Sequence, residues 1–303
     1  MKDLFKPIPL SISAISLACL SLGNLLQMHS ILLKHLLSIL GILIYIIYIL
    51  KYIFSYQDAL VQLKDPTVFS LLPTFSMATM LLADYLFDYI GNITFYLWLF
   101  GLILNLLIYL AFIYKYILHY NKDTMYPTFF VSVVGFVIAS VTGPTFNQIL
   151  LGQILFYIGL LGYTLILILM IRYILTHPPY PSGTNLTMAI FCAPVALLIT
   201  GYTSVFDTLY YPLLIPLVII EIITYLYVII QVILPNLFKS YYPTLSAFTF
   251  PLVISATAFT RLGIIFLPEN SFLFYPIYLT HLIALIAVIT VIYKFIKALY
   301  IKK

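Results

Sequence analysis

The sequence predicts an all-α integral membrane protein with ten transmembrane helices in one domain. Hydrophobic residues make up 64% of the 303-residue chain and charged residues only 8%, whereas soluble domains carry about a quarter charged residues. Apolar runs of about 18 or more residues, long enough to cross a bilayer, follow one another along the chain. With so few charges the chain could not cover its surface in water, so we expect it to lie in a lipid bilayer.

Turn and loop signals separate the apolar runs. Clusters of proline, glycine and polar residues occur at 64–66, 121–123, 178–183, 235–236 and 268–270. The expected spans are about 7–28, 33–55, 68–89, 92–118, 126–146, 149–175, 184–205, 211–234, 243–266 and 274–298. Little chain lies between them, so we expect residues 1–303 to form a single transmembrane domain.

The first apolar run allows a second interpretation. Lys2 and Lys6 precede an apolar stretch that ends in Leu17-Ala18-Cys19, a pattern similar to a signal peptide. Ser16 stands where a lipoprotein signal has a large aliphatic residue. We therefore interpret the run as the first span.

Basic residues predict the orientation of the spans. One side has twelve of them and the other only Lys34 and Arg261. The richer side carries Lys2, Lys6, Lys51, Lys64, Lys115, Lys122, Arg172, Lys239, Lys294, Lys297, Lys302 and Lys303. Loops rich in lysine and arginine stay in the cytoplasm, so we expect both termini there. The scatter of these residues over short loops argues against nucleic-acid binding.

The spans alternate between two compositions. Even-numbered spans are bulky and most end in an aromatic-plus-basic anchor such as Tyr114-Lys115-Tyr116. Odd-numbered spans carry small and hydroxyl residues, and prolines recur in them at Pro9, Pro73, Pro127, Pro194 and Pro251. A proline inside a span kinks the helix and frees a carbonyl group.

This alternation predicts five helical hairpins of about 60 residues. Kinked odd helices would form an inner ring, and bulky even helices an outer ring that faces lipid or neighbouring subunits. Five helices in a ring can enclose an axial pore. The alternative is a solid bundle, in which small residues such as Gly135, Ala139 and Gly143 only allow close helix packing.

Several segments resemble one membrane-protein family. The ninth span reads Ser246-Ala247-Phe248-Thr249-Phe250-Pro251-Leu252, which is similar to the W-A-[FY]-[ST]-F-P segment of the TehA-like tellurite-resistance and C4-dicarboxylate transporter family. That family includes the plant guard-cell slow anion channels. Further pieces agree in the same order: Lys6-Pro7-Ile8-Pro9, Met80-Leu81-Leu82-Ala83-Asp84, Tyr126-Pro127-Thr128-Phe129-Phe130, Ala193-Pro194 and Gly201-Tyr202.

The resemblance implies ten helices in a pseudo-five-fold arrangement of hairpins, a central pore in each subunit and a homotrimer. It also implies that Phe250 is the pore gate and that Pro73, Pro194 and Pro251 kink the pore-lining helices. The chain departs from the family at Ser246, where tryptophan is common, and at Ser16 and Ser132, where relatives can place prolines.

Ionisable residues inside spans are candidate functional groups. Asp84 and Arg261 lie at similar depth in the third and ninth spans, where they would pair or line an outer vestibule, or else reach the membrane interface separately. Glu221 lies near mid-depth in the eighth span; it could be protonated, paired with an amide or hydroxyl, or a proton-coupling site.

Catalytic and metal-binding patterns were not found in the sequence. No two histidines have metal-ligand spacing on one helix face, and no Walker A, GxSxG or HExxH motif occurs. We therefore expect no metal, no cofactor and no enzymatic activity. The predicted function is movement of small anions across the cytoplasmic membrane. The alternative is a proton-coupled carrier of C4-dicarboxylates, sulfite or tellurite-related anions.

Overall fold

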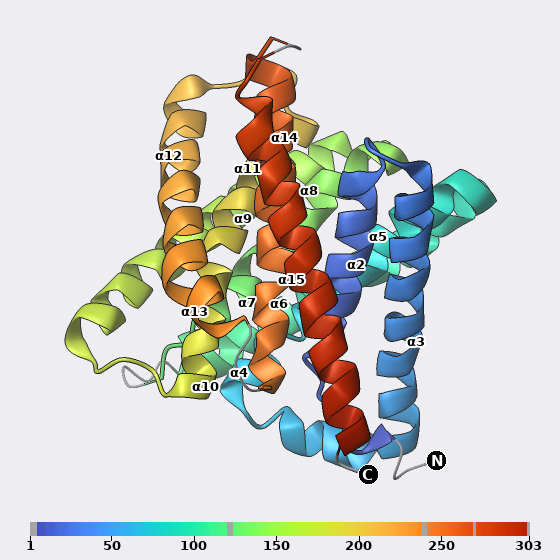
Figure 1. The fold of residues 1–303 in the computed structure, drawn as a ribbon, viewed down its shortest axis with the longest axis vertical. Coiled ribbons are helices and arrows are strands. Elements are labelled where there is room, and N and C mark those ends of the chain that lie inside the picture. The colour runs from blue at the N-terminus through green and yellow to red at the C-terminus, as the bar shows by residue number, and fades with distance from the viewer. Residues whose placement is uncertain (1–4, 120–123, 238–240, 269–270, 302–303) are drawn as a thin grey trace.

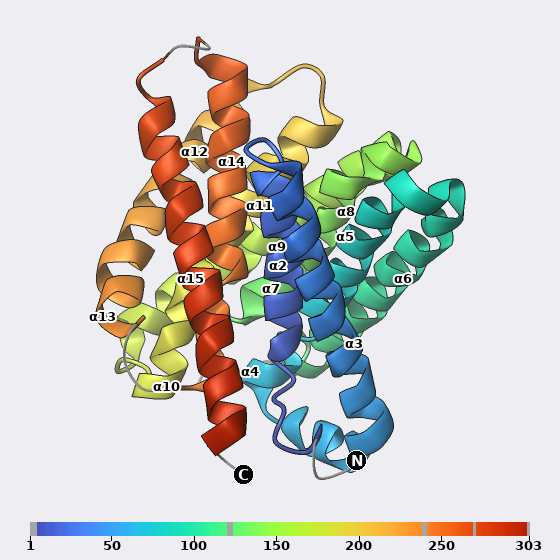
Figure 2. The ribbon, with the colours of Figure 1, turned by 45° about the vertical axis from the view of Figure 1, so that its right-hand side comes forward.

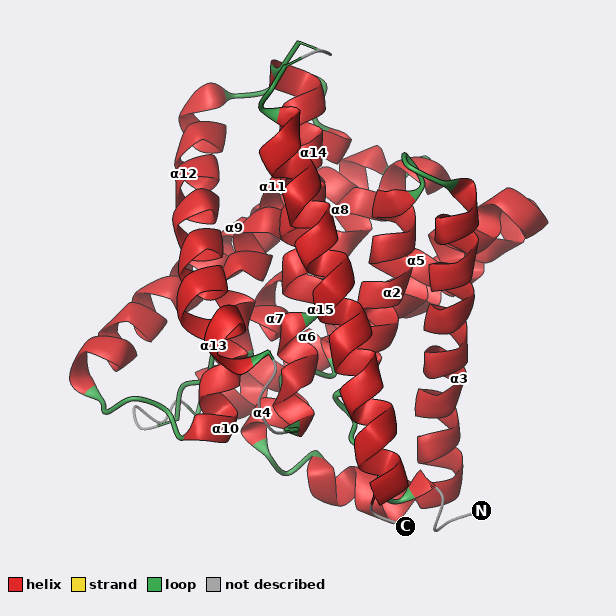
Figure 3. Ribbon diagram, in the orientation of Figure 1, coloured by secondary structure: helices red, strands yellow, loops and turns green. Residues whose placement is uncertain are grey.

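The protein is built from helices that cross one another in a bundle. A computed structural model describes residues 5–119, 124–237, 241–268 and 271–301, and no strand occurs in this part of the chain. Figure 3 shows helices joined by short loops. The described residues do not include Lys2, Lys122, Lys239, Lys302 and Lys303, the loop expected at 121–123, or residues 269–270 of the loop expected at 268–270.

Eight helices are long and apolar enough to cross a membrane, within the ranges described. One of them, Pro66–Ile117, spans 52 residues and reverses direction at Gly91, whose φ of 65° suits a residue without a Cβ. This turn separates α5 (Pro73–Ile90) from α6 (Thr94–Phe112), which pack against each other. The shorter helix α2 (Ile12–Leu26) is also apolar.

Helices with buried surroundings alternate along the chain with helices that expose one side. The buried set comprises α2, α5, α7 (Phe129–Val134) with α8 (Ile138–Thr142), α11 (Ala193–Val205) and α14 (Phe250–Phe266). The exposed set comprises α3 (Ile31–Gln62), α6, α9 (Ile149–Thr176), α12 (Tyr211–Tyr227) and α15 (Phe274–Ile301). Short helices α4 (Pro66–Phe69), α10 (Ser182–Asn185) and α13 (Leu234–Asn236) lie in the connections.

The buried helices contact one another in chain order, and the last returns to the first. Contacts run from α2 to α5, α8, α11 and α14, and α14 packs back on α2. Each is also packed against the exposed helix that follows it in the chain. Figures 1 and 2 show α3, α12 and α15 on the outside of the bundle, with α2, α11 and α14 further in. We call the buried set the inner helices and the exposed set the outer helices.

Prolines stand at the beginnings of inner helices. Pro73 is the first residue of α5, and Pro194 and Pro251 are the second residues of α11 and α14. A first-turn proline lacks only an N–H that has no helical partner there anyway. The segments before α11 and α14 are 3₁₀ helices, η5 (Leu186–Cys192) and η7 (Pro243–Phe248). At Pro194 and Pro251 the chain thus changes from a 3₁₀ helix to an α-helix rather than bending within one α-helix.

The fifth expected span is interrupted without a proline. A 3₁₀ segment, η3 (Gly135–Val137), separates α7 from α8, and the span ends in another, η4 (Gly143–Phe146). Gly135 lies so close to α5 that an added Cβ would come within 3.1 Å of Pro73 Cβ and 3.2 Å of Met77 Sδ. The interruption therefore occurs at a close approach between two inner helices.

The first and last described segments of the chain lie at the same end of the bundle in Figure 1, which we call the terminal end; the opposite end is the far end. Helix α3 continues past its expected limit at residue 55. A kink at Ser55 (φ −138°) changes the direction of its last two turns. Asp58 then forms an ion pair with the buried Lys51. Gln62 accepts a hydrogen bond from Leu10 N at 2.9 Å, which fastens the segment before α2.

Candidate functional site

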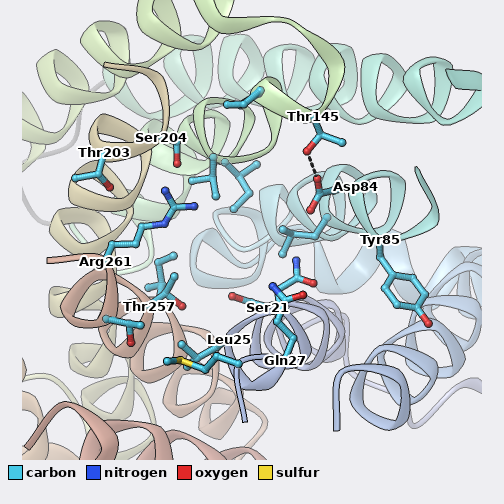
Figure 4. Close-up of a pocket in the computed structure, with 18 of the residues that line it drawn as sticks. Ser21, Leu25, Gln27, Asp84, Tyr85, Thr145, Thr203, Ser204, Thr257 and Arg261 are labelled. Atoms are coloured by element: carbon cyan, nitrogen blue, oxygen red, sulfur yellow. Dashed lines mark hydrogen bonds between the residues drawn. The ribbon is translucent and has the colours of Figure 1, made fainter. Parts of the chain in front are cut away.

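A large cavity opens toward the far end of the bundle. Its volume is about 760 Å³, and all five inner helices contribute to its wall. Figure 4 shows its polar lining. The polar wall residues are Ser21, Asn24, Gln27, Lys34, Asp84, Tyr85, Asp88, Thr145, Thr203, Ser204, Thr257, Thr260 and Arg261. We call this space the far vestibule.

Asp84 and Arg261 lie in different walls of the far vestibule. Asp84 Oδ1 accepts a hydrogen bond from Thr145 Oγ1 at 2.6 Å. Arg261 projects from α14 into the cavity in Figure 4, and the two charges attract each other across it. No ion pair joins them, and no described residue accepts a hydrogen bond from the guanidinium group. Arg261 is therefore a cation whose donors remain available to a ligand in the cavity.

The second cation of the vestibule is already paired. Lys34 Nζ lies 3.2 Å from Asp88 Oδ2, and the Asp88 side chain is 61% exposed. A surface pair of this kind contributes little energy, but it neutralises the rim. The remaining unpaired charges are thus Arg261 and the hydroxyl-bound Asp84.

A chain of three side chains leads from the surface into the vestibule wall. His29 Nε2 lies 2.9 Å from His281 Nδ1, and His281 Nε2 lies 2.7 Å from Thr260 Oγ1. The Thr260 hydroxyl itself donates to Ala256 O, so it accepts from His281. No sequence pattern predicts this contact, because the two histidines are 252 residues apart and only the packing of α15 on α2 joins them.

Phe250 lies at a small apolar space further along the same helices. This space has a volume of only about 40 Å³. Its lining again comes from every inner helix, with the 3₁₀ segments included: Ala14, Leu71, Thr74, Met77, Phe130, Val131, Val134, Gly135, Ile190, Ala193, Pro194, Leu197, Ser246, Ala247, Phe250 and Pro251. We call it the constriction.

Hydroxyl groups at the constriction have their protons engaged elsewhere. Thr74 Oγ1 donates to Leu71 O at 2.7 Å, and Ser246 Oγ donates to Pro243 O at 3.2 Å. A water molecule needs two or more polar partners, which the remaining aliphatic and aromatic lining does not supply. The constriction is therefore an apolar barrier. Phe248, two residues before Phe250, is completely buried and does not line it.

A third space opens at the terminal end. Its volume is about 520 Å³, and Leu71 lines both this space and the constriction. Its wall includes Pro9, Ser11, Gln62, Asp65, Thr184 and Thr244. Along α14 and η7 the three spaces follow in order: Arg261 at the far vestibule, Phe250 at the constriction and Thr244 at the terminal end. The same order holds along α2, so the spaces are aligned with the inner helices.

The expected functional residues thus fall into two groups, with Pro73 and Glu221 outside both. Asp84 and Arg261 line the far vestibule, whereas Phe250, Pro194 and Pro251 line the constriction. Pro73 lies beside the constriction, at the close approach to Gly135. Glu221 lines none of the three spaces. The described residues contain no group of three or more histidine, cysteine or acidic side chains suited to a metal ion.

Comparison with protein families finds a match over nearly the whole chain. The family model SLAC1, described as a voltage-dependent anion channel, matches residues 6–297. The chain belongs to this family. A search of curated proteins finds no match. Membership makes the chain a multi-pass membrane protein of an anion channel and transporter family, and it confirms the resemblance that the ninth-span segment indicated.

Proposed function

We propose that the protein is a channel for small monovalent anions, in which the ring of Phe250 closes the path at the constriction. One observation carries this proposal: two polar spaces, aligned along the inner helices, are separated by an apolar barrier that contains Phe250. An aromatic ring in a narrow apolar segment blocks ions because it prevents wetting. Anion preference follows from Arg261, whose donors face the far vestibule.

The charge balance of the vestibule favours single negative charges. An anion beside Arg261 also feels Asp84 on another wall, since both side chains line one cavity. Arg261, the one unpaired cation among the described wall residues, can neutralise a single negative charge, so the second charge of a dianion would have no cationic partner and would still be repelled by Asp84. Chloride or nitrate is therefore a better ligand than a dicarboxylate at this site.

The architecture that we propose has ten membrane spans in five hairpins around a central pore. Counting α2 as a span and dividing Pro66–Ile117 at Gly91 gives ten. Both termini would be cytoplasmic, since most of the described basic residues belong to the terminal end and only Lys34 and Arg261 to the far end. Labelling of single cysteines at Lys64 and Pro268 tests this: reagent from outside the cell should reach only position 268, and labelling of both would contradict the topology.

The assembly that we propose is a homotrimer in the cytoplasmic membrane. Large apolar side chains are exposed along all the outer helices, for example Leu161 at 62% and Ile223 at 62%. Such surfaces suit lipid and neighbouring subunits alike. Mass measurement of the detergent-solubilised protein tests the subunit number.

A proton-coupled carrier of C4-dicarboxylates, sulfite or tellurite-related anions is the second candidate. The closed constriction supports it, because a carrier also needs an occluded state. We assign neither candidate an enzymatic activity.

Planar-bilayer recording with chloride, nitrate and malate tests the proposal. A channel conducts without a proton gradient, and we expect chloride and nitrate to carry more current than malate. Transport that saturates and requires a proton gradient would instead support the carrier.

A further inference from the structure

Glu221 occupies a closed polar cluster outside the ion path. Its side chain, on α12, is completely buried, and neither carboxyl oxygen has a hydrogen-bond partner within bonding distance. Two hydroxyl groups are also buried without partners, Tyr225 Oη on the same helix and Ser255 Oγ on α14. Unpartnered buried polar atoms are rare in proteins, so this concentration calls for a bound species.

The groups that face Glu221 come from four neighbouring elements. Ser255 on α14 and the backbone N–H of Ala196 on α11 lie near the carboxyl. Cys192 on η5, Tyr163 on α9 and Tyr225 interact with it electrostatically. The Cys192 thiol donates to Ala189 O. All of these neighbours are neutral in their ordinary form, and none of them carries a positive charge.

A lone carboxylate at this place would be very costly. Transfer of an isolated charge into a medium of low dielectric constant costs tens of kcal/mol by ideal solvation, so such groups are neutralised or paired. One compensating positive charge is therefore required. A metal ion would need more oxygen ligands than one carboxyl and two hydroxyls provide. A proton needs only one acceptor, and neighbouring hydroxyls can accept from the resulting acid.

We propose that Glu221 is a proton-binding site, in which the neutral carboxylic acid donates a hydrogen bond to Ser255 and accepts from the Ala196 N–H. The bound proton joins α12 to α14 and α11. Helix α14 brings Phe250 and Pro251 to the constriction, and α11 brings Pro194. Because Glu221 lines none of the three spaces, the proton remains bound during anion movement. This inference does not depend on the proposed channel function.

Infrared spectroscopy of the purified protein tests the proposal directly. A protonated carboxyl has a carbonyl stretch that a carboxylate lacks. At neutral pH we expect the difference spectrum between the wild type and Glu221→Gln to contain this band. Asp88→Asn is the matched control: its exposed, Lys34-paired carboxyl should contribute only carboxylate bands. Carboxylate bands alone at Glu221 would overturn the proposal.

The dependence of stability on pH provides a second test. If the folded state holds a proton that the unfolded state releases above a pKa of about 4.3, the wild type loses stability relative to Glu221→Gln as pH rises. The ratio of their unfolding equilibrium constants should change about tenfold per pH unit. A ratio independent of pH, or wild-type stability that rises with sodium or potassium concentration, would contradict a bound proton.

Ser255→Ala keeps the proposal testable if the glutamine variant does not fold. This change removes the acceptor but leaves the carboxyl in place. The acid band should remain and move to higher frequency, since its hydrogen bond is weaker. An unchanged band position would show that Ser255 is not the partner, and loss of the band would show that Glu221 is ionised.

Discussion

The inner and outer helices are both apolar, but inner helices are packed on all sides and outer helices expose one side. In the spans that contain α7–α8, α11 and α14, 67–83% of the residues in the most apolar window are buried, against 28–39% in those of α3, α9, α12 and α15. Inner helices carry serine, threonine, glycine and proline because they pack on every side and border the aligned spaces. Outer helices carry isoleucine, leucine and tyrosine because one side needs no specific partner. Burial thus separates the two sets, and the exposed outer helices are also the more hydrophobic ones.

The largest effect should follow from removing the ring at the constriction. In Phe250→Ala the apolar barrier loses its aromatic side chain, so we expect anion conductance to rise several-fold while the protein stays folded. Single-channel recording measures this change. Phe248→Ala is the matched control: that ring is completely buried away from the constriction, so its loss should cost about 3–5 kcal/mol of stability without a gain in current. Equal gains at both positions would remove Phe250 as the gate.

A smaller effect is expected at the far vestibule. Arg261→Gln removes the unpaired cation, and we expect the half-saturating chloride concentration to rise about tenfold, equivalent to about 1.4 kcal/mol of binding energy. Asp84→Asn should shift it the opposite way, since it removes a repelling charge. Lys34→Gln, at the neutralised rim, should change it little. Anion titration of the current separates these variants, and an unchanged value in Arg261→Gln would exclude the arginine from the anion site.

Close packing between inner helices should make added atoms costly. At Gly201 an added Cβ would lie 2.8 Å from Val137 Cγ1 and 3.2 Å from Ser140 Cβ. We therefore expect Gly201→Ala to lower stability by about 1–3 kcal/mol. Gly183→Ala is the comparison, because its nearest neighbour, Tyr242 Cδ1, would be at an ordinary 3.4 Å. Thermal unfolding in detergent measures both, and equal stability of the two variants would contradict a tightly packed inner ring.

The smallest effect is expected on the outer surface. Leu161→Ala and Ile223→Ala change side chains that are 62% exposed, so each should alter subunit stability by no more than about 0.5 kcal/mol. The same variants also test whether each position faces lipid or a neighbouring subunit. A change in oligomer size with unchanged subunit stability would identify a subunit contact, whereas no change in either would identify a lipid-facing position.

The helix-breaking residues show where sequence reasoning reached its limit. Pro194 and Pro251 were expected to kink the inner helices, and both do border the constriction. The change there is from a 3₁₀ segment to an α-helix that has the proline as its second residue. Proline chemistry predicts a disturbance, but the type of helix before it depends on neighbouring helices. The interruption at Gly135 has no proline of its own and coincides with a close approach to α5.

Composition and pattern by themselves determined the class of this protein. The share of charged residues and the length of the apolar runs require a bilayer and helices, because backbone groups in lipid must be bonded within each span. The alternation of bulky and small spans also separates outer from inner helices, because small residues allow helices to pack closely. The segment around Phe250, together with shorter similar segments in the same order along the chain, indicated the family.

Only the tertiary structure decided which side chains meet. Thr145 donates to Asp84, His29 contacts His281 and Ser255 faces Glu221, and each pair joins residues from different spans. No local pattern encodes such contacts, since rotation and tilt of each helix are set by packing against its neighbours. For the same reason the sequence left Glu221 open between three roles, while its complete burial among neutral groups singles out a bound proton.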